Sequence, residues 1–228
     1  CSSSLVALHQ ACQSIWSGES SMAIAGGINM LIHPFGFVGF SKASMLSPTG
    51  RCQTFDANGD GYVRAEGAAV LFLKPLAQAE ADGDPIHAVI VASGINCDGH
   101  THGMTVPSPE QQGYLLNSIY RRAGIDLDKI SYIEAHGTGT AIGDPLETRA
   151  LGEVIGDARR ADNPLPIGSV KTNVGHLETA SGMAGLLKTV LCLKHRALPA
   201  SLHVKTLTPR IDFTGLNLKV VTQFTPLV

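Results

Sequence analysis

Segments patterned like strands alternate with segments that begin like helices, and this alternation constrains the fold more than any other feature of the sequence. Residues 68–73 form an unbroken apolar run, which is typical of a strand covered on both faces. Ser108 and Asp144 each stand directly before a proline, and Gln111 and Glu147 follow three residues after them. That spacing is the signature of a helix start. The sequence therefore predicts an α/β protein whose helices cover a mixed sheet.

The same reasoning places the other elements. Helices are predicted at residues 3–17, from 108 onward, at 144–156 and at 177–195, and strands at 22–28, 68–73, 86–93, 132–135, 167–170 and 216–221. A glycine-rich loop region is expected between the first two strands, up to about residue 66. A length of 228 residues with 44% hydrophobic content suits one globular domain or part of a larger one.

Composition argues against several classes of protein. The net charge is −2 and aromatic residues make up 5% of the chain, so neither a nucleic-acid nor a membrane partner is expected. The five cysteines are odd in number and form no CxxC pair, which indicates reduced thiols and a cytoplasmic location. The apolar stretch at 22–40 contains glycines, His33 and Pro34, which argues against a membrane helix.

Cys1 is the candidate nucleophile. It stands directly before a predicted helix, where backbone N–H groups and the helix dipole favour a thiolate. The three serines that follow it could cap that helix. Taken alone, an incidental buried cysteine is the more ordinary interpretation. A cysteine before serines also resembles a lipoprotein terminus, but Leu5, Leu8 and Cys12 follow at helical spacing where a polar tether would be expected.

Two histidines follow predicted strands and precede helix-like segments. His136 comes after the strand at 132–135, and His176 follows the strand at 167–170. Strand ends of this kind are where α/β folds place ligands. The glycines after His136 lack the third glycine of a dinucleotide loop, because position 142 is isoleucine. A thiolate and neutral histidines are the groups that condensation of two thioesters requires.

Signals for metals are weaker. Residues 56–61 mimic the start of a calcium loop, but Gly67 stands where the bidentate glutamate belongs. Cys97, His100 and His102 do not have the spacing of a zinc site. No metal site is predicted.

The segments CSSSLVAL at 1–8, EAHGTGT at 134–140 and KTNVGHLE at 171–178 resemble the three signatures of β-ketoacyl synthases, in the order found in that family. Shorter segments at 40–42, 50–52, 55–57 and 143–145 resemble the ketosynthase domains of type I polyketide synthases. The resemblance extends over essentially the whole chain. It implies decarboxylative Claisen condensation of an acyl thioester with a malonyl-type extender.

The resemblance assigns a role to each matching residue. Cys1 matches the acyl-accepting nucleophile, and its backbone N–H matches one oxyanion donor. His136 and His176 match the pair that assists decarboxylation and stabilises the enolate, and Lys171 matches the lysine that supports them. Thr138 and Thr140 match hydroxyls that contact a phosphopantetheine arm. That arm would belong to an acyl carrier protein, and the domain itself would bind no cofactor.

The resemblance also implies a fold and an assembly. The expected fold is thiolase-like, an α-β-α-β-α sandwich of two similar halves, and the family is normally a homodimer. Residues 1–76 would end the N-terminal half, and residues 77–228 would form most of the C-terminal half. The chain is expected to be incomplete at both ends, since the family has a segment before the nucleophile and a glycine- and phenylalanine-containing loop near its C-terminus. The isolated piece is therefore expected to be inactive.

Three alternatives stay open at this point. The condensing domain of a fatty acid synthase would use the same chemistry. A non-catalytic ketosynthase-like partner protein would usually lack the cysteine that is present here. A hydrolase with Cys1 as an N-terminal nucleophile would require Cys1 to be a mature terminus.

Overall fold

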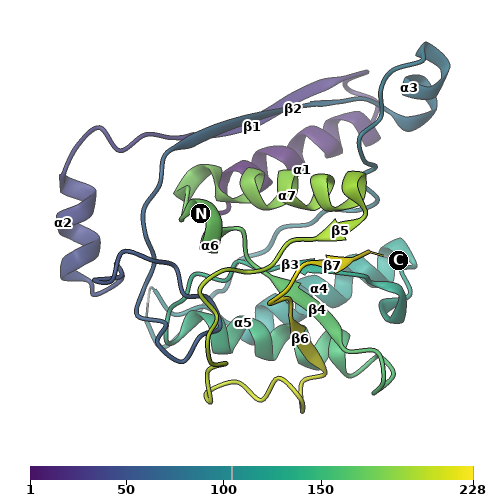
Figure 1. Ribbon diagram of the computed structural model, residues 1–228. Coiled ribbons are helices and arrows are strands. Elements are labelled where there is room, and N and C mark those ends of the chain that lie inside the picture. Colours follow the sequence, from purple (N-terminus) through teal and green to yellow (C-terminus); the bar gives the residue numbers. More distant parts are fainter. Residues whose placement is uncertain (104, 228) are drawn as a thin grey trace.

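The computed structural model describes residues 1–103 and 105–227, in which helices and strands form alternating layers (Figure 1). The helices are α1 (Ser3–Trp16), α2 (Phe35–Lys42), α3 (Leu76–Asp82), α4 (Pro109–Ala123), α5 (Gly143–Leu151), α6 (Lys171–Val174) and α7 (Ser181–His195). The strands are β1 (Ala23–Asn29), β2 (Gly67–Leu73), β3 (Ile133–Glu134), β4 (Leu165–Gly168), β5 (Ala197–Leu198), β6 (Leu218–Val220) and β7 (Thr225–Pro226). Short helical turns occupy Leu127–Lys129, Gly152–Gly156 and Glu178–Ala180.

The strands make three small sheets. β1 and β2 pair antiparallel along their whole length, from Ala23 opposite Leu73 to Asn29 opposite Gly67. β3, β4 and β6 form a parallel sheet in that order. β5 and β7 form a short antiparallel pair.

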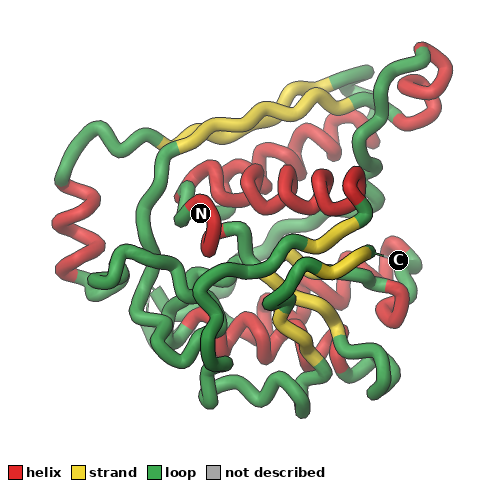
Figure 2. The backbone as a smooth tube through the Cα atoms, in the orientation of Figure 1, coloured by secondary structure: helices red, strands yellow, loops and turns green. Residues whose placement is uncertain are grey.

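Helices α1 and α7 lie between the β1–β2 pair and the parallel sheet, and α4 and α5 lie on the other side of that sheet (Figures 1 and 2). The two larger hydrophobic cores follow from this arrangement. Leu8 and Cys12 of α1 and Met183 of α7 pack under β1. The parallel sheet packs through Leu165 and Ile167 against residues that include Ile155. The described residues thus make four of the five layers of an α-β-α-β-α sandwich.

The sequence predicted most of these elements to within a few residues. The start of α4 agrees in detail, because Ser108 Oγ accepts a hydrogen bond from the N–H of Gln111. The predicted helix at 144–156 is α5, which continues into a π-helical turn at Gly152–Gly156. α7 begins at Ser181, after a 3₁₀ turn at Glu178–Ala180, instead of at residue 177.

Four predictions about local structure were wrong. Residues 86–93 form no strand, because their backbone groups have no ladder partner within the described ranges. The strand at 68–73 is covered on one face only, and Val70 and Phe72 are 69% and 60% exposed. The glycine-rich region contains helix α2. Ser2 occupies the N-cap of α1 without a side-chain hydrogen bond, because its backbone is already in the helical region.

Among residues 1–103 and 105–227, no helix has the length and apolar content needed to cross a membrane.

Candidate active site

Three element ends bring Cys1, His136 and His176 together. Cys1 lies just before α1, His136 lies after β3, and His176 follows α6, the short helix that comes after β4. The Sγ atom of Cys1 and one ring nitrogen of each histidine all lie within 4.8 Å of one another. The two imidazole rings meet edge to face, with centroids 5.3 Å apart. Residues from three distant parts of the sequence therefore share one site.

Glycine is required in the loop that carries His136. Gly137 has a φ of +41°, and a Cβ atom there would lie 2.7 Å from the side chain of Ser169 and equally close to that of Thr54. Gly139 has a φ of +79° and passes close to the backbone of Gln53. A side chain at either position would strain the backbone and displace the loop.

Two carboxylates at the start of α5 accept hydrogen bonds from the backbone of the same loop. The oxygens of Glu147 accept hydrogen bonds from the N–H groups of His136, at 2.6 Å, and Gly137, at 2.9 Å. Asp144 accepts from the N–H groups of Gly139 and Phe55, both at 3.0 Å. Burial raises the pKa of Glu147, and it raises the pKa of Asp144 to about 6.

Lys171 contacts both the backbone and the ring of His136. Its ammonium donates to the carbonyl oxygen of His136 at 2.6 Å and lies 3.4 Å from Nδ1 of that ring. Lys171 is 4% exposed, and burial lowers its pKa while the carboxylates of Glu147 and Glu134 favour the charged form. A lysine ammonium has no lone pair, so it donates to Nδ1 and leaves the proton of the neutral ring on Nε2.

His176 has the same tautomer for a separate reason. Its Nδ1 atom accepts a hydrogen bond of 2.8 Å from the backbone N–H of Glu178 and lies 2.8 Å from Ser181 Oγ. A backbone N–H only donates, so Nδ1 carries no proton and Nε2 does. The site thus has two imidazole N–H donors beside the Cys1 thiol.

Both rings are neutral near pH 7. Desolvation and the charge of Lys171 lower the pKa of the buried His176 to about 3, and the same two causes hold the pKa of His136, which keeps an exposed surface, well below its usual range. A neutral N–H donor can stabilise an enolate or thioester oxyanion without first losing a proton to solvent.

The trio has residue types that also bind zinc. The tautomer of His176 does not suit a metal, because Nε2 offers a hydrogen where a metal needs a lone pair. His176 therefore has no free lone pair on Nε2 for a metal while its Nδ1 accepts from the Glu178 N–H.

Thr138 and Thr140 are brought together, and their hydroxyl oxygens lie 2.9 Å apart. Thr140 Oγ1 also accepts from the N–H of Gly143 at 3.1 Å. The hydroxyls of the pair thus bond to each other and to the start of α5.

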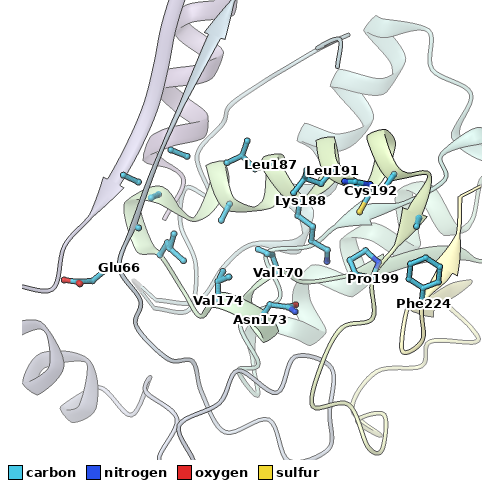
Figure 3. Close-up of a pocket in the computed structure, with 18 residues that line it drawn as sticks. Glu66, Val170, Asn173, Val174, Leu187, Lys188, Leu191, Cys192, Pro199 and Phe224 are labelled. Atoms are coloured by element: carbon cyan, nitrogen blue, oxygen red, sulfur yellow. The ribbon is translucent and has the colours of Figure 1, made fainter. Parts of the chain in front are cut away.

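An apolar pocket lies elsewhere in the described part of the chain. It has a volume of about 580 Å³, and residues of β2 and α7 form much of its mainly apolar lining (Figure 3). Leu187, Leu191 and Cys192 line it along α7, and Lys188 reaches into its floor. None of Cys1, His136 and His176 lines this pocket, so we do not equate it with the reaction site.

Sequence reasoning missed several residues of this site. Asp144 was identified as a helix start and as part of a family-like segment, and Glu147 as a helix-start residue, but neither was predicted to accept hydrogen bonds from the His136 loop. Glu134 was missed as well. It lies 2.8 Å from Lys188 Nζ and accepts from the N–H of Val170, the residue before Lys171.

Comparison with known proteins agrees with this geometry. The model of the β-ketoacyl synthase N-terminal domain matches residues 1–79, and that of the C-terminal domain matches residues 87–205. This chain belongs to the β-ketoacyl synthase family. A phenolphthiocerol/phthiocerol polyketide synthase of Mycobacterium tuberculosis is 51% identical over 221 residues, which are 97% of this chain and 12% of that protein. The highly reducing polyketide synthase resH of Aspergillus sclerotiorum is 46% identical over 99% of this chain and 9% of its own length.

Solved ketosynthases share the fold. The ketosynthase from module 6 of the bacillaene synthase of Bacillus subtilis matches with a TM-score of 0.97 and 42% identity, over all of this chain and 41% of that chain. An oxazolomycin ketosynthase domain of Streptomyces albus matches with a TM-score of 0.96 and 41% identity, over all of this chain and 39% of that chain. The thiolase-like fold expected from the sequence is confirmed. The chain spans about a tenth of the curated relatives and about two fifths of the solved ketosynthases.

Proposed function

We propose that this chain carries the reacting residues of a polyketide-type ketosynthase. The observation that supports the proposal is the convergence of Cys1, His136 and His176 within 4.8 Å, with both imidazoles neutral. The relatives above are polyketide synthases, which favours polyketide over fatty acid synthesis. The presence of the thiol and both histidines argues against a non-catalytic partner protein.

The first half-reaction loads the enzyme. The Cys1 sulfur attacks the carbonyl carbon of an acyl thioester, and a new carbon–sulfur bond forms. The old carbon–sulfur bond breaks, and the phosphopantetheine sulfur of an acyl carrier protein leaves with a proton. This step leaves the acyl group on Cys1.

The second half-reaction joins the two units. A malonyl-type thioester loses carbon dioxide, and the electrons of the broken bond form an enolate. The Nε2–H groups of His136 and His176 donate to the developing enolate oxygen. The enolate carbon then attacks the acyl carbon on Cys1, and the Cys1 sulfur leaves. Lys171 holds the backbone and ring of His136 throughout.

Further parts of the proposal concern binding and assembly. Thr138 and Thr140 contact the phosphopantetheine arm, the protein acts as a homodimer, and it works in the cytoplasm. Residues 1–76 and 77–228 belong to the two halves of the fold. The isolated chain is inactive, a proposal supported by the exposed apolar face of β1 and β2, where Ile24 and Val70 are 72% and 69% exposed.

Assay of the full-length protein with an acyl thioester and a carrier-bound malonyl thioester tests the proposal. We expect release of carbon dioxide in step with a β-ketoacyl product. Hydrolysis of the acyl thioester without carbon–carbon bond formation would contradict it and would favour a hydrolase.

A further inference from the structure

A partly buried ion pair lies next to His176 and has no part in the reaction steps above. Arg64 Nε lies 2.5 Å from Glu178 Oε1, and Arg64 Nη2 lies 2.9 Å from Glu178 Oε2. The two side chains are 8% and 17% exposed. A two-point arginine–carboxylate contact fixes orientation as well as distance.

Both partners of the ion pair are tied to His176 through the backbone. The N–H of His176 donates to the carbonyl of Val63 at 2.7 Å, and the N–H of Ala65 donates to the carbonyl of His176 at 3.0 Å. Arg64 therefore sits on a segment that pairs directly with His176. On the other side, the N–H of Glu178 donates to Nδ1 of the His176 ring.

The Glu178 backbone needs a restraint to make that last bond. Its φ is +43°, in the left-handed region that residues with a Cβ seldom adopt. This conformation turns the N–H of Glu178 back onto the imidazole. The ion pair with Arg64 anchors the side chain of the same residue and so opposes a return to ordinary backbone angles.

Of the two contacts to His176 Nδ1 among the described residues, the Glu178 N–H is the one that selects a tautomer. Ser181 Oγ also contacts Nδ1, but a hydroxyl donates or accepts and is compatible with either tautomer. Loss of the Glu178 contact would therefore let the ring proton move to Nδ1. In that tautomer Nε2 has no hydrogen to give to an enolate oxygen.

Helix α2 covers the outer side of the ion pair. The guanidinium carbon of Arg64 lies 4.7 Å and 5.2 Å from the ring centroids of Phe37 and Phe40. Gly36 passes so close to the guanidinium that a Cβ atom there would collide with Arg64 Nη1. Aromatic rings exclude water and thereby strengthen the attraction between the guanidinium and the carboxylate.

We propose that Arg64 and Glu178 are positioning residues that hold His176 in its Nε2–H tautomer for condensation. The inference rests on the proposed function, because it assigns a purpose to that tautomer. Neither residue touches the reacting atoms; both act through the His176 ring.

The test uses Arg64→Gln, Glu178→Gln and the double variant in the full-length protein. We expect each single variant to lower kcat for condensation by about 10- to 100-fold, a part of the 10²- to 10³-fold effect of removing one charge-stabilising donor. KM for carrier-bound malonyl thioester and the rate of Cys1 loading should change less than about threefold. The double variant should be no slower than the slower single variant, because both substitutions break one contact. Arg64→Lys, which keeps the charge, should recover part of the rate.

Arg159→Gln is the matched control. Arg159 is a second buried arginine, and it donates to the carbonyls of Leu127 and Ile130, away from His176. Its loss should lower thermal stability and leave kcat unchanged.

The inference is overturned if the Arg64 and Glu178 variants lower kcat no more than the control does, or if their effects multiply in the double variant. His176→Ala separates the two claims: normal condensation in that variant would overturn the proposed function itself.

Discussion

Replacement of Glu147 with glutamine should slow condensation, because this side chain holds the backbone of His136. The carboxylate offers one oxygen to the N–H of His136 and the other to the N–H of Gly137. Glutamine keeps one acceptor oxygen and turns an NH₂ group toward the second N–H. One hydrogen bond to a charged acceptor is lost, which costs about 1.5–3 kcal/mol.

Both stability and rate should respond. In the full-length protein, that loss should lower the thermal midpoint by less than about 4 °C per kcal/mol, because the shift becomes smaller as the unfolding domain becomes larger. A shift of His136 by about 1 Å would reduce the condensation rate by up to about 10²-fold. Loading of Cys1 should be affected much less, because Glu147 touches only the loop of His136.

The assay compares condensation, Cys1 loading and thermal midpoint in Glu147→Gln and in Glu153→Gln. Glu153 lies just beyond α5, in the turn that continues it, and makes a half-exposed ion pair with Arg149, so its loss should cost less than about 1 kcal/mol. Wild-type rate and midpoint in Glu147→Gln would refute the reasoning. They would show that burial keeps this carboxyl protonated and that one acceptor oxygen is enough.

Three further predictions follow from the same geometry. His136→Ala should retain acyl loading of Cys1 and lose condensation by about 10²–10³-fold; unchanged turnover would rule out its role as a donor. Gly137→Ala should lower the condensation rate at least about tenfold, because its Cβ would lie 2.7 Å from Ser169. The control Gly83→Ala should leave the rate unchanged, because Gly83 has a φ of +70° but open space around it. Equal rates in the two variants would contradict the steric argument. His176 has a pKa of about 3 in the folded protein. Below about pH 6.5 the unfolded chain therefore takes up a proton on this residue that the folded protein does not. The contribution of His176 to stability should fall by about 1.4 kcal/mol per pH unit as the pH is lowered to about 3. A His176→Asn variant should lack that part of the pH dependence, and an unaltered slope in urea unfolding would show that His176 is protonated when folded.

Local sequence signals were sufficient for the elements that carry the site. Ser108 and Asp144 marked helix starts because capping is decided within one turn of the chain. The segments around His136 and His176 were recognised by their resemblance to a known family, and each contains glycine at positive φ, at Gly137 and Gly139 in the first and at Gly175 in the second. The sequence motifs therefore predicted that Cys1, His136 and His176 would lie in one site.

Contacts between distant segments could not be predicted from local pattern. The pairing of Arg64 with Glu178 joins residues 114 positions apart, and no spacing rule links them. The segment at 86–93 has the residues of a strand but no partner within the described ranges, and strand formation depends on a partner. Helix α2 was missed because glycines and aromatics favour other conformations, and its position over Arg64 is a tertiary effect.

Mass spectrometry of the full-length protein after brief incubation with an acyl thioester tests the central claim most directly. The account predicts one acyl group on the peptide that contains Cys1, its loss on addition of carrier-bound malonyl thioester, and no adduct in Cys1→Ala. An adduct on Cys52 or another cysteine, or a stable Cys1 adduct that malonyl thioester does not discharge, would contradict it.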